Sequence, residues 1–220
     1  MKILISIFLA FYMMIQVVKA EIQSSDLIKL ASNISENVLN LAVKAFNCAN
    51  KGLKKPIKNF SIIDYSLPST DKRFWSFAIK NKNKTYKLLY YELVAHGKNT
   101  GANYANHFSN IQGSKQSSLG LFLTGATYTG RNGYSLYLNG LEKGINDKAL
   151  KRSIVMHGAK YVSQDFINKH GRLGRSWGCP AFTQAMAKEI IDHIKHDQYV
   201  FIYYPDKDWL NDSVFLNCSE

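Results

Sequence analysis

The chain has 220 residues, of which 46% are hydrophobic, and a formal net charge of +12. This length suits a single domain with a sizeable core, and the sequence contains no internal repeat or low-complexity linker. The basic balance favours anionic partners such as nucleic acid, membrane surfaces or acidic wall polymers. The lysines are spread along the chain, however, and equally fit an ordinary solvated surface.

Residues 1–20 have the three parts of a secretory signal peptide. Lys2 supplies a positive start, Ile3–Val18 is a nearly continuous apolar run, and Ala20 ends a small-residue cleavage site. The run is short for a membrane span, which needs about 20 apolar residues. A retained anchor is the alternative, because Lys19 is an unusual neighbour of a cleavage point. Cleavage would lower the net charge from +12 to +10 and give an exported protein of the periplasm or cell envelope, or a secreted one, without a transmembrane span. Export makes nucleic acid the least expected partner.

Residues 21–58 are predicted to form a helical arm that packs on the domain. The residues from Ser24 to Asp26 can cap a helix, and apolar residues recur at helical spacing from Leu27 to Phe46. Pro56 prevents the helix from continuing further.

From residue 59 to residue 220 the pattern changes to that of a mostly β domain. Seven runs rich in aromatic and branched residues are separated by turn residues. These runs are Phe60–Tyr65, Arg73–Lys80, Tyr86–His96, Gly120–Gly125, Tyr134–Leu138, Ser153–His157 and Tyr199–Tyr204. Many short strands with one clear late helix predict an α+β chain that is mostly β, built as a β-sandwich or a half-open barrel.

A candidate nucleophile and its base come from the last third of the chain. Ser153–Met156 is typical of a buried strand that leads to His157, whereas Ala181–His196 has the apolar period of a helix. Pro180 fits a first helical turn and so places Cys179 at the helix cap, where the helix dipole lowers the pKa of a thiol. His157 is then the natural base for the thiol proton.

The neighbours of these two residues suit acyl transfer. Gly178 leaves room beside the sulfur for a substrate carbonyl, and the N–H groups of Gly178 and Cys179 are candidates for an oxyanion hole. Either the carbonyl of Gly158 or the hydroxyl of Ser176 can orient the imidazole of His157. Each residue also has a structural interpretation, since a free cysteine is usually a small buried hydrophobe and a histidine at a strand end is commonly hydrogen-bonded.

This segment and three others upstream carry a resemblance to a known family. In this order they resemble the L,D-transpeptidase catalytic domain (YkuD-like) family, in particular its murein L,D-transpeptidase branch, over about residues 60–205. The matching stretches are HGKNTG from His96, FSNIQGSKQSSLGLFLTG from Phe108, YSLYLNGLEKGIND from Tyr134, and HGAKYVSQDFINKHGRLGRSWGCP from His157. The resemblance implies a β-sandwich with a helix over the active site, catalysis by Cys179 and His157, and peptidoglycan stem peptides as partners.

Two departures from the family pattern concern substrate binding. The residue before Gly178 is often His or Arg in the family and is Trp177 here. The polar or basic residue that often follows the cysteine is replaced by Pro180-Ala181. The candidates to bind the substrate carboxylate are therefore Arg172 and Arg175, with Trp177 beside them, and solvated loop charges are the alternative for the two arginines.

The other histidines allow further interpretations. His96 is followed by glycine, as His157 is, and either lines the cleft opposite Cys179 as a substrate contact or ends a strand without a chemical role. A metal site made of His96, His157, His170 and Cys179 lacks the paired spacing of ordinary zinc ligands. We therefore expect no metal and no other cofactor.

The three cysteines leave one thiol over after any single disulfide. A Cys48–Cys218 bridge would join the two ends of the domain in an oxidising compartment and leave Cys179 reactive. The alternative is that Cys48 and Cys218 stay unpaired, because sequence alone does not fix a connectivity. The oligomeric state is likewise left open.

Together these features predict thiol acyl transfer outside the cytoplasm. Cys179 attacks a carbonyl, and His157 protonates the leaving amine to give a thioester. The resemblance implies that D-alanine leaves a stem peptide and that an amine on a second stem completes a crosslink, which is an L,D-transpeptidase reaction. Water as acceptor would make the enzyme an L,D-carboxypeptidase, and a protein lysine would make it an anchoring enzyme. A papain-type peptidase would need Cys before His, and a non-catalytic wall-binding protein is favoured only by the basic charge.

Overall fold

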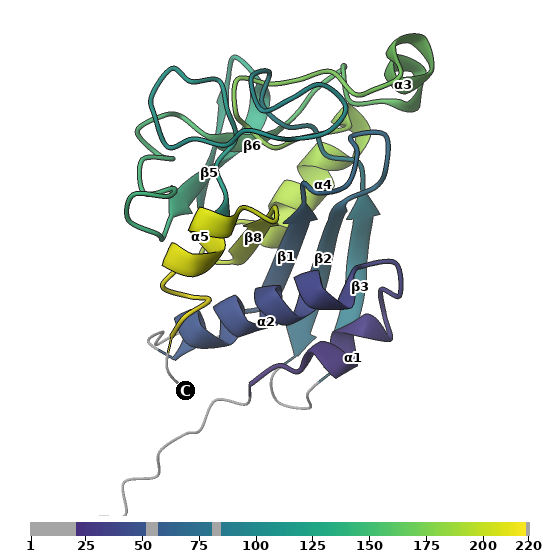
Figure 1. Ribbon diagram of the computed structural model, residues 1–220. Helices are drawn as coiled ribbons and strands as arrows, with labels where there is room; N and C mark the ends of the chain where they lie inside the picture. The colour runs from purple at the N-terminus through teal and green to yellow at the C-terminus, as the bar shows by residue number, and fades with distance from the viewer. Residues whose placement is uncertain (1–20, 52–56, 81–84, 219–220) are drawn as a thin grey trace, which may run out of the picture.

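Among the residues that the structure describes, eight strands form a single sheet. The structure is a computed structural model that describes residues 21–51, 57–80 and 85–218. The strands are β1 (Asn59–Asp64), β2 (Phe74–Lys80), β3 (Thr85–Glu92), β4 (Gly120–Gly130), β5 (Gly133–Gly140), β6 (Val155–Gly158), β7 (Ala181–Phe182) and β8 (Tyr199–Tyr203). They lie in the order β3-β2-β1-β8-β4-β5-β6-β7. The predicted mostly β architecture is confirmed, and of its two forms the curled half-open barrel is the one present (Figure 1).

The centre of the sheet is the pair β1 and β8, which run parallel. On one side β1 continues antiparallel into β2 and β3, and on the other side β8 continues antiparallel into β4 and β5. β6 then pairs antiparallel with β5 and parallel with the short β7. All residues of β8 and nearly all of β1 are buried, which is typical of strands covered on both faces.

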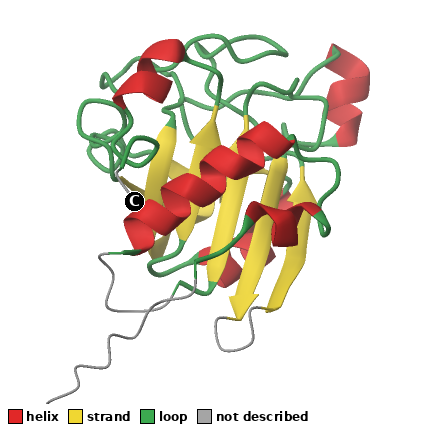
Figure 2. Ribbon diagram, turned by 60° about the horizontal axis from the view of Figure 1, so that its bottom comes forward, coloured by secondary structure: helices red, strands yellow, loops and turns green. Residues whose placement is uncertain are grey.

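Helices supply that cover. α1 (Ser24–Ile28) and α2 (Glu36–Asn50) lie on one face, α4 (Gln184–Ile194) lies on the other, and α3 (Gln164–His170) sits at the periphery (Figures 1 and 2). α5 (Lys207–Asp212) packs the ring of Trp209 on Phe201 and Tyr203 of β8. The ring of Phe46 in α2 packs on Phe60 of β1 and Tyr199 of β8, with ring centroids 5.0 and 5.6 Å apart. The helical arm therefore shares one hydrophobic core with the sheet.

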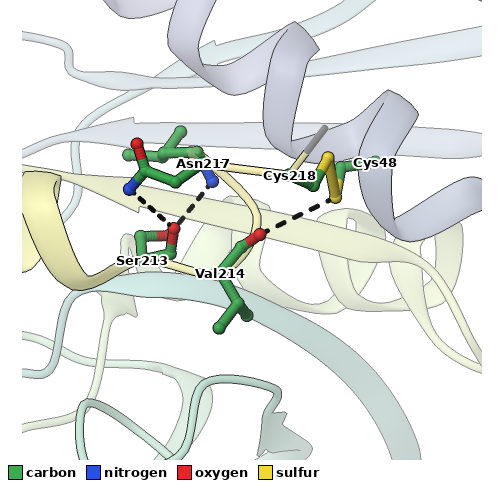
Figure 3. Close-up of a disulfide and its surroundings, with 6 residues drawn as sticks. Cys48, Ser213, Val214, Asn217 and Cys218 are labelled. Atoms are coloured by element: carbon green, nitrogen blue, oxygen red, sulfur yellow. Dashed lines mark hydrogen bonds between the residues drawn. A yellow bond between two sulfur atoms is a disulfide. The ribbon is translucent and has the colours of Figure 1, made fainter. Parts of the chain in front are cut away.

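A disulfide joins α2 to the C-terminal segment. Cys48 and Cys218 form this bond, and their Cα atoms lie 6.4 Å apart (Figure 3). The sulfur of Cys48 also lies 3.9 Å from the carbonyl oxygen of Val214. Of the two interpretations of the cysteines, the structure has the paired one, and Cys179 is the free cysteine.

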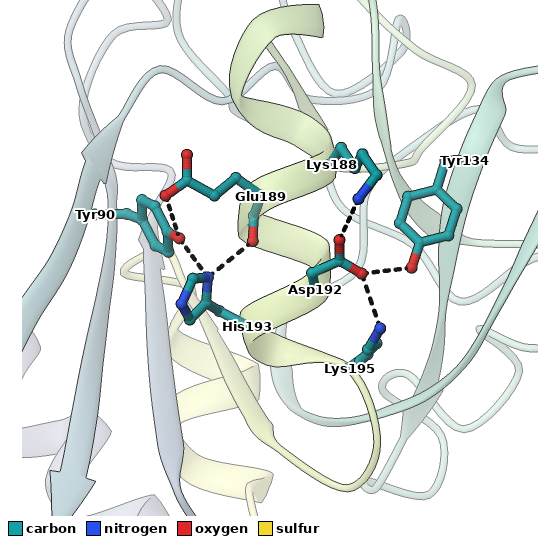
Figure 4. Close-up of polar contacts among 7 residues, drawn as sticks. All are labelled: Tyr90, Tyr134, Lys188, Glu189, Asp192, His193 and Lys195. Carbon is teal, nitrogen blue, oxygen red and sulfur yellow. Dashed lines mark hydrogen bonds and ion pairs between the residues drawn. The ribbon is translucent and has the colours of Figure 1, made fainter.

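Polar contacts hold α4 against strands on both sides of it (Figure 4). On one side the Tyr90 hydroxyl of β3 contacts Glu189 and His193 at 3.0 and 2.5 Å. On the other side the Tyr134 hydroxyl of β5 donates a hydrogen bond of 2.7 Å to Asp192. Asp192 in addition pairs with two lysines, Lys188 and Lys195. These contacts connect one helix to two strands that are not neighbours in the sheet.

The late helix begins further along the chain than predicted. Ala181–Phe182 form β7, and α4 begins at Gln184. The Thr183 hydroxyl caps the helix by accepting a hydrogen bond of 3.3 Å from the N–H of Met186. The predicted helix start was therefore wrong, because Pro180 fits an extended chain as well as a first helical turn, and pairing with β6 selects the extended chain.

The predicted strand Tyr86–His96 is also shorter in the structure and ends at Glu92. The chain then crosses the segment around Cys179, with which it forms two isolated bridges, Ala95 to Ala181 and Gly97 to Ser176. His96 is thus part of a connection and not the last residue of a strand, because single bridges to another segment replace the ladder with β2.

Some predictions lie outside the described residues, namely the signal peptide at residues 1–20 and the role of Pro56 after α2. Both stay predictions. Within the described ranges, no helix combines the length and apolar character that a membrane span requires.

Candidate active site

His157 lies in β6 and is almost fully buried. Its ring nitrogen Nδ1 is 3.0 Å from the carbonyl oxygen of Gly158. Because a carbonyl only accepts, Nδ1 carries the proton and donates it, which leaves Nε2 as a basic nitrogen. Burial lowers the pKa of His157 from its ordinary value, so the imidazole is neutral near pH 7. Of the two predicted orienting groups, Gly158 is the one that contacts the ring.

Cys179 precedes β7 and is 7% exposed. Its Sγ atom accepts a hydrogen bond of 3.5 Å from the N–H of Val155 and lies 3.6 Å from the carbonyl oxygen of Ser153, to which the thiol donates. Burial raises the pKa of Cys179, while the Val155 N–H and the charge of Arg152 act in the opposite direction with less effect. The predicted lowering of this pKa by a helix terminus is wrong, because β7 separates Cys179 from α4.

Hydrogen bonds within the loop fix the backbone before the nucleophile. The hydroxyl of Ser176 donates to the carbonyl of Cys179 at 2.6 Å and accepts from the N–H of Gly178 at 3.0 Å. Ser176 therefore holds the Cys179 loop and does not orient the imidazole. Since the Gly178 N–H is already engaged, the predicted two-donor oxyanion hole loses one donor, and the N–H of Cys179 is the remaining candidate.

Gly178 is needed for its backbone and for close packing. Its φ is +122°, in the region that favours glycine. A Cβ atom at this position would lie 2.7 Å from the carbonyl oxygen of Gln116 and 2.9 Å from the side chain of Ile154. The carbonyl of Gly178 in turn accepts a hydrogen bond of 3.0 Å from Ser117. Gly178 thus seats the loop, and its predicted role in leaving room for the substrate stays a prediction.

A pocket of about 380 Å³ joins the two candidate catalytic residues. It is lined by Arg131, Asn132, Arg152, Ser153, His157, Tyr161, Arg175, Ser176, Trp177 and Cys179. The structure therefore brings together five of the residues singled out in the sequence. Three arginines and no carboxylate line the pocket, which suits an anionic ligand.

The two arginines predicted to bind a carboxylate occupy neighbouring positions. Arg175 lines the main pocket and donates from Nη1 to the carbonyls of Lys98 and Gly101, at 3.2 and 2.8 Å. Arg172 lies in an adjoining pocket of about 280 Å³, to which Arg175, Lys98 and Tyr161 also contribute. Burial, and the charge of Arg172, lower the pKa of Arg175. Neither arginine forms an ion pair with any residue that the structure describes, and two like charges side by side favour an anion between them.

Trp177 is exposed at the mouth of the pocket, with 66% of its surface accessible. The ammonium of Lys115 lies over its ring, 4.8 Å from the centroid. Such a contact is worth roughly 0.5–1 kcal/mol at an exposed site and leaves the other face of the indole free to meet a ligand.

His96 does not line this pocket. Its side chain is fully buried, and the Arg73 guanidinium donates to its Nδ1 at 2.8 Å. The other ring nitrogen, 3.4 Å from the carbonyl of Gly101, therefore carries the proton. Burial and the charge of Arg73 lower the pKa of His96 to about 3. The predicted contact between His96 and substrate is corrected accordingly, because a neutral, enclosed imidazole supports the connecting segment instead.

Sequence reasoning missed several pocket residues, among them Arg152, Tyr161 and Arg131. Arg152 precedes the strand of His157, but the chain holds 28 lysines and arginines and nothing in its neighbourhood sets this one apart. Tyr161 follows His157 closely, and burial and the charge of Cys179 raise its pKa. As for the metal alternative, the described part of the chain holds no group of three residues able to bind an ion.

A family model described as YkuD_2, L,D-transpeptidase catalytic domain, matches residues 30–203. A search of curated proteins gave no match. Similar solved structures include an L,D-transpeptidase from Mycobacterium smegmatis, with 10% identity over 67% of this chain and 59% of that one and a TM-score of 0.40.

Two further solved structures are similar at the same level. The helical cell shape determining protein Pgp2 from Campylobacter jejuni is 14% identical over 74% of this chain and 56% of that one, with a TM-score of 0.46. A fused zinc-dependent amidase/peptidase/peptidoglycan-binding domain-containing protein from Clostridium acetobutylicum is 18% identical over 76% and 62%, with a TM-score of 0.38. This chain thus spans less than two thirds of the length of each of these proteins, and the family assignment rests on the family model alone.

Proposed function

Because the chain belongs to the L,D-transpeptidase catalytic domain family, we propose that it is an exported cysteine acyltransferase that acts on peptidoglycan stem peptides. In this proposal Cys179 forms a thioester with the stem, D-alanine leaves, and an amine of a second stem accepts the acyl group. The enzyme is then an L,D-transpeptidase of cell wall biogenesis. Family membership itself supports the coarser statement, an enzyme domain that modifies peptidoglycan.

One observation carries the proposal. A free thiol and a neutral imidazole with a basic Nε2 line the same pocket of about 380 Å³. The imidazole of His157 comes from β6 and the thiol of Cys179 from the loop just before β7, and β6 pairs with β7, so the sheet sets the separation of the two groups. A nucleophile and a base on rigid elements are what acyl transfer through a thioester requires.

The geometry suggests how the proton moves. At rest the thiol donates to the carbonyl of Ser153, so it is protonated. Rotation of the Cys179 side chain toward His157 lets Nε2 take the proton as the sulfur attacks the substrate carbonyl. The N–H of Cys179 then faces the developing oxyanion. His157 returns the proton to the leaving amine, and the thioester remains on Cys179.

The second half of the reaction reverses these roles. The acceptor amine attacks the thioester, His157 takes a proton from that amine, and the thiol leaves with a proton from the imidazole. Arg175, with Arg172 in the adjoining pocket, is proposed to bind a carboxylate of the donor stem. Trp177 at the mouth offers an apolar face to the same chain.

Export is a separate part of the proposal, supported by the sequence of residues 1–20 and by the Cys48–Cys218 disulfide. Disulfides persist in oxidising compartments such as the periplasm. Fractionation of cells, followed by N-terminal sequencing of the protein, tests it. A chain that starts after Ala20 in the envelope fraction is expected, whereas an intact N-terminus in the cytoplasm would contradict export.

The activity is tested with purified protein and a disaccharide-tetrapeptide from peptidoglycan, with the products read by mass spectrometry. The wild type is expected to release D-alanine and form a crosslinked dimer, and a Cys179→Ala variant is expected to form neither. A tripeptide with free D-alanine but no dimer would identify an L,D-carboxypeptidase instead. Absence of any product would refute transfer between stem peptides and favour wall binding or transfer to a protein lysine.

A further inference from the structure

Arg152 lies in the wall of the pocket that holds Cys179. Its two terminal nitrogens donate four hydrogen bonds, of 2.5 to 3.1 Å, to one connecting segment, residues 109–118. The acceptors are the carbonyls of Ser109 and Gln116 and the hydroxyls of Ser114 and Ser118. The guanidinium of Arg152 thus holds both ends of this segment beside the candidate active site.

The same segment seats the nucleophile loop. The Gln116 carbonyl that accepts from Arg152 also packs closely on Gly178, where an added Cβ atom would lie only 2.7 Å from the carbonyl oxygen. The neighbouring Ser117 accepts from the N–H of Gly97 and donates to the carbonyl of Gly178, both at 3.0 Å. The wall behind Gly178 and Cys179 is therefore held in place through Arg152.

The charge of Arg152 is not cancelled by a neighbour. All four of its acceptors are neutral, and within the described residues no carboxylate forms an ion pair with it. Its Nε atom is buried and makes no hydrogen bond in the same part of the chain. A cation without a counter-ion acts strongly on nearby groups where water is excluded.

Cys179 is the group on which this charge acts. Burial raises the pKa of Cys179 and lowers that of Arg152, and the attraction between the thiolate and the guanidinium opposes both shifts. The other titratable groups that face the thiol, from the pocket and from the core beneath it, are Arg131, Arg175, His157, Tyr161 and Tyr65. Burial raises the pKa of both tyrosines and lowers that of His157, so these three are neutral near pH 7. Arg175 is held by two backbone carbonyls of another segment.

We propose that Arg152 is the positioning residue of Cys179. Its charge stabilises the Cys179 thiolate, and its hydrogen bonds fix the 109–118 segment against the loop that carries Cys179. Arg152 thus supplies the thiolate stabilisation that the sequence analysis expected from a helix terminus. The inference rests on the proposed role of Cys179 as nucleophile. It makes no assumption about the substrate or the acceptor.

The test is the rate at which iodoacetamide alkylates Cys179 across a range of pH, read by mass spectrometry of the intact protein. With Cys48 and Cys218 bonded to each other, Cys179 is the one free thiol and reports alone. Arg152→Gln is expected to label about tenfold more slowly near pH 7, with its pH profile moved to higher pH, since a tenfold lower thiolate fraction corresponds to a rise of about one in pKa.

Two variants complete the test. Arg152→Lys keeps the charge and is expected to label within about threefold of the wild type. Lys151→Gln removes an exposed charge next to it in sequence and is expected to change nothing. The proposal is overturned if Arg152→Gln keeps the wild-type profile, or if Lys151→Gln shifts it equally. Should Arg152→Gln fail to fold, a tenfold slower Arg152→Lys would overturn it. Because labelling needs no peptidoglycan, a missing crosslinked product would refute the proposed function without touching this result.

Discussion

At the scale of single residues, both candidate catalytic groups rest uncharged. Burial lowers the pKa of His157 and raises that of Cys179, so neutral imidazole and neutral thiol are the stable pair. A thiol of this kind needs its proton removed during the attack and not before. The hydrogen bond from His157 to Gly158 keeps Nε2 available for that step.

The protonation of His157 predicts how activity depends on pH. The base works only when neutral, and burial lowers its pKa below the ordinary 6.5, so kcat/KM is expected to fall on the acid side with a midpoint below 6.5. D-alanine release measured from acid to neutral pH checks this. A His157→Gln variant is expected to lose roughly 100-fold to 10,000-fold in rate. An acid limb centred above 6.5 would contradict the assignment.

Gly178 provides a prediction about packing. Gly178→Ala is expected to lower the free energy of unfolding by about 2 kcal/mol or more, because it combines a positive φ with a contact to the Gln116 carbonyl. Gly144→Ala is the matched control, since Gly144 also has a positive φ but open space around its Cβ position. Urea unfolding compares the two variants. Equal losses would show that the Gln116 contact is unimportant.

At the scale of elements, the residues between Cys179 and α4 decide which element positions the thiol. β7 occupies this interval, pairs with β6 and places Ala181 opposite His157. The thiol of Cys179 is therefore positioned by strand pairing, and the helix dipole, which falls off within the first turn, reaches it weakly.

The helix cap separates these two effects. Thr183→Ala removes the side chain that accepts from the Met186 N–H and is expected to destabilise the protein by about 1 kcal/mol. The pH profile of Cys179 alkylation is expected to stay unchanged, because the thiol is not on the helix. Thermal unfolding and the labelling assay measure the two quantities. A shifted profile would restore the helix terminus as the source of thiolate stabilisation.

At the scale of the whole molecule, the N-terminal helices and the C-terminal segment form one body with the sheet. Phe46 of α2 packs on both central strands, and the Cys48–Cys218 bond spans a sequence separation of 170 residues. A bond that closes so long a loop restricts the unfolded chain strongly.

Removing this bond is expected to weaken the fold while sparing the site. A double variant, Cys48→Ser with Cys218→Ser, is expected to lose about 2–4 kcal/mol of unfolding free energy. The active-site pocket is lined from other segments, so D-alanine release per folded molecule is expected to stay near that of the wild type. Cys179→Ser serves as the opposite control, stable but inactive. A double variant as stable as the wild type would contradict the role of the bridge.

Much of the fold was predictable because strands and helices are encoded locally. Aromatic and branched runs marked β1, β2 and β8 closely, and the apolar period marked α2 and most of α4. The candidate catalytic pair was predictable as well, since residue types and order singled out Cys179 and His157, which line one pocket in the structure. The ends of elements were less so: β3 stops early and α4 starts late, because contacts with distant segments settle where each one ends.

The sequence by itself determined the class of the fold, the family, and the candidate nucleophile with its candidate base. The tertiary structure alone decided how these residues are held. It enclosed His96 beside Arg73, turned Ser176 toward the Cys179 carbonyl, and brought Arg152 and the segment 109–118 to the thiol. The physical reason is that periodicity and propensity act over a few neighbouring residues, whereas burial, hydrogen-bond partners and pKa depend on groups that meet only when the sheet closes.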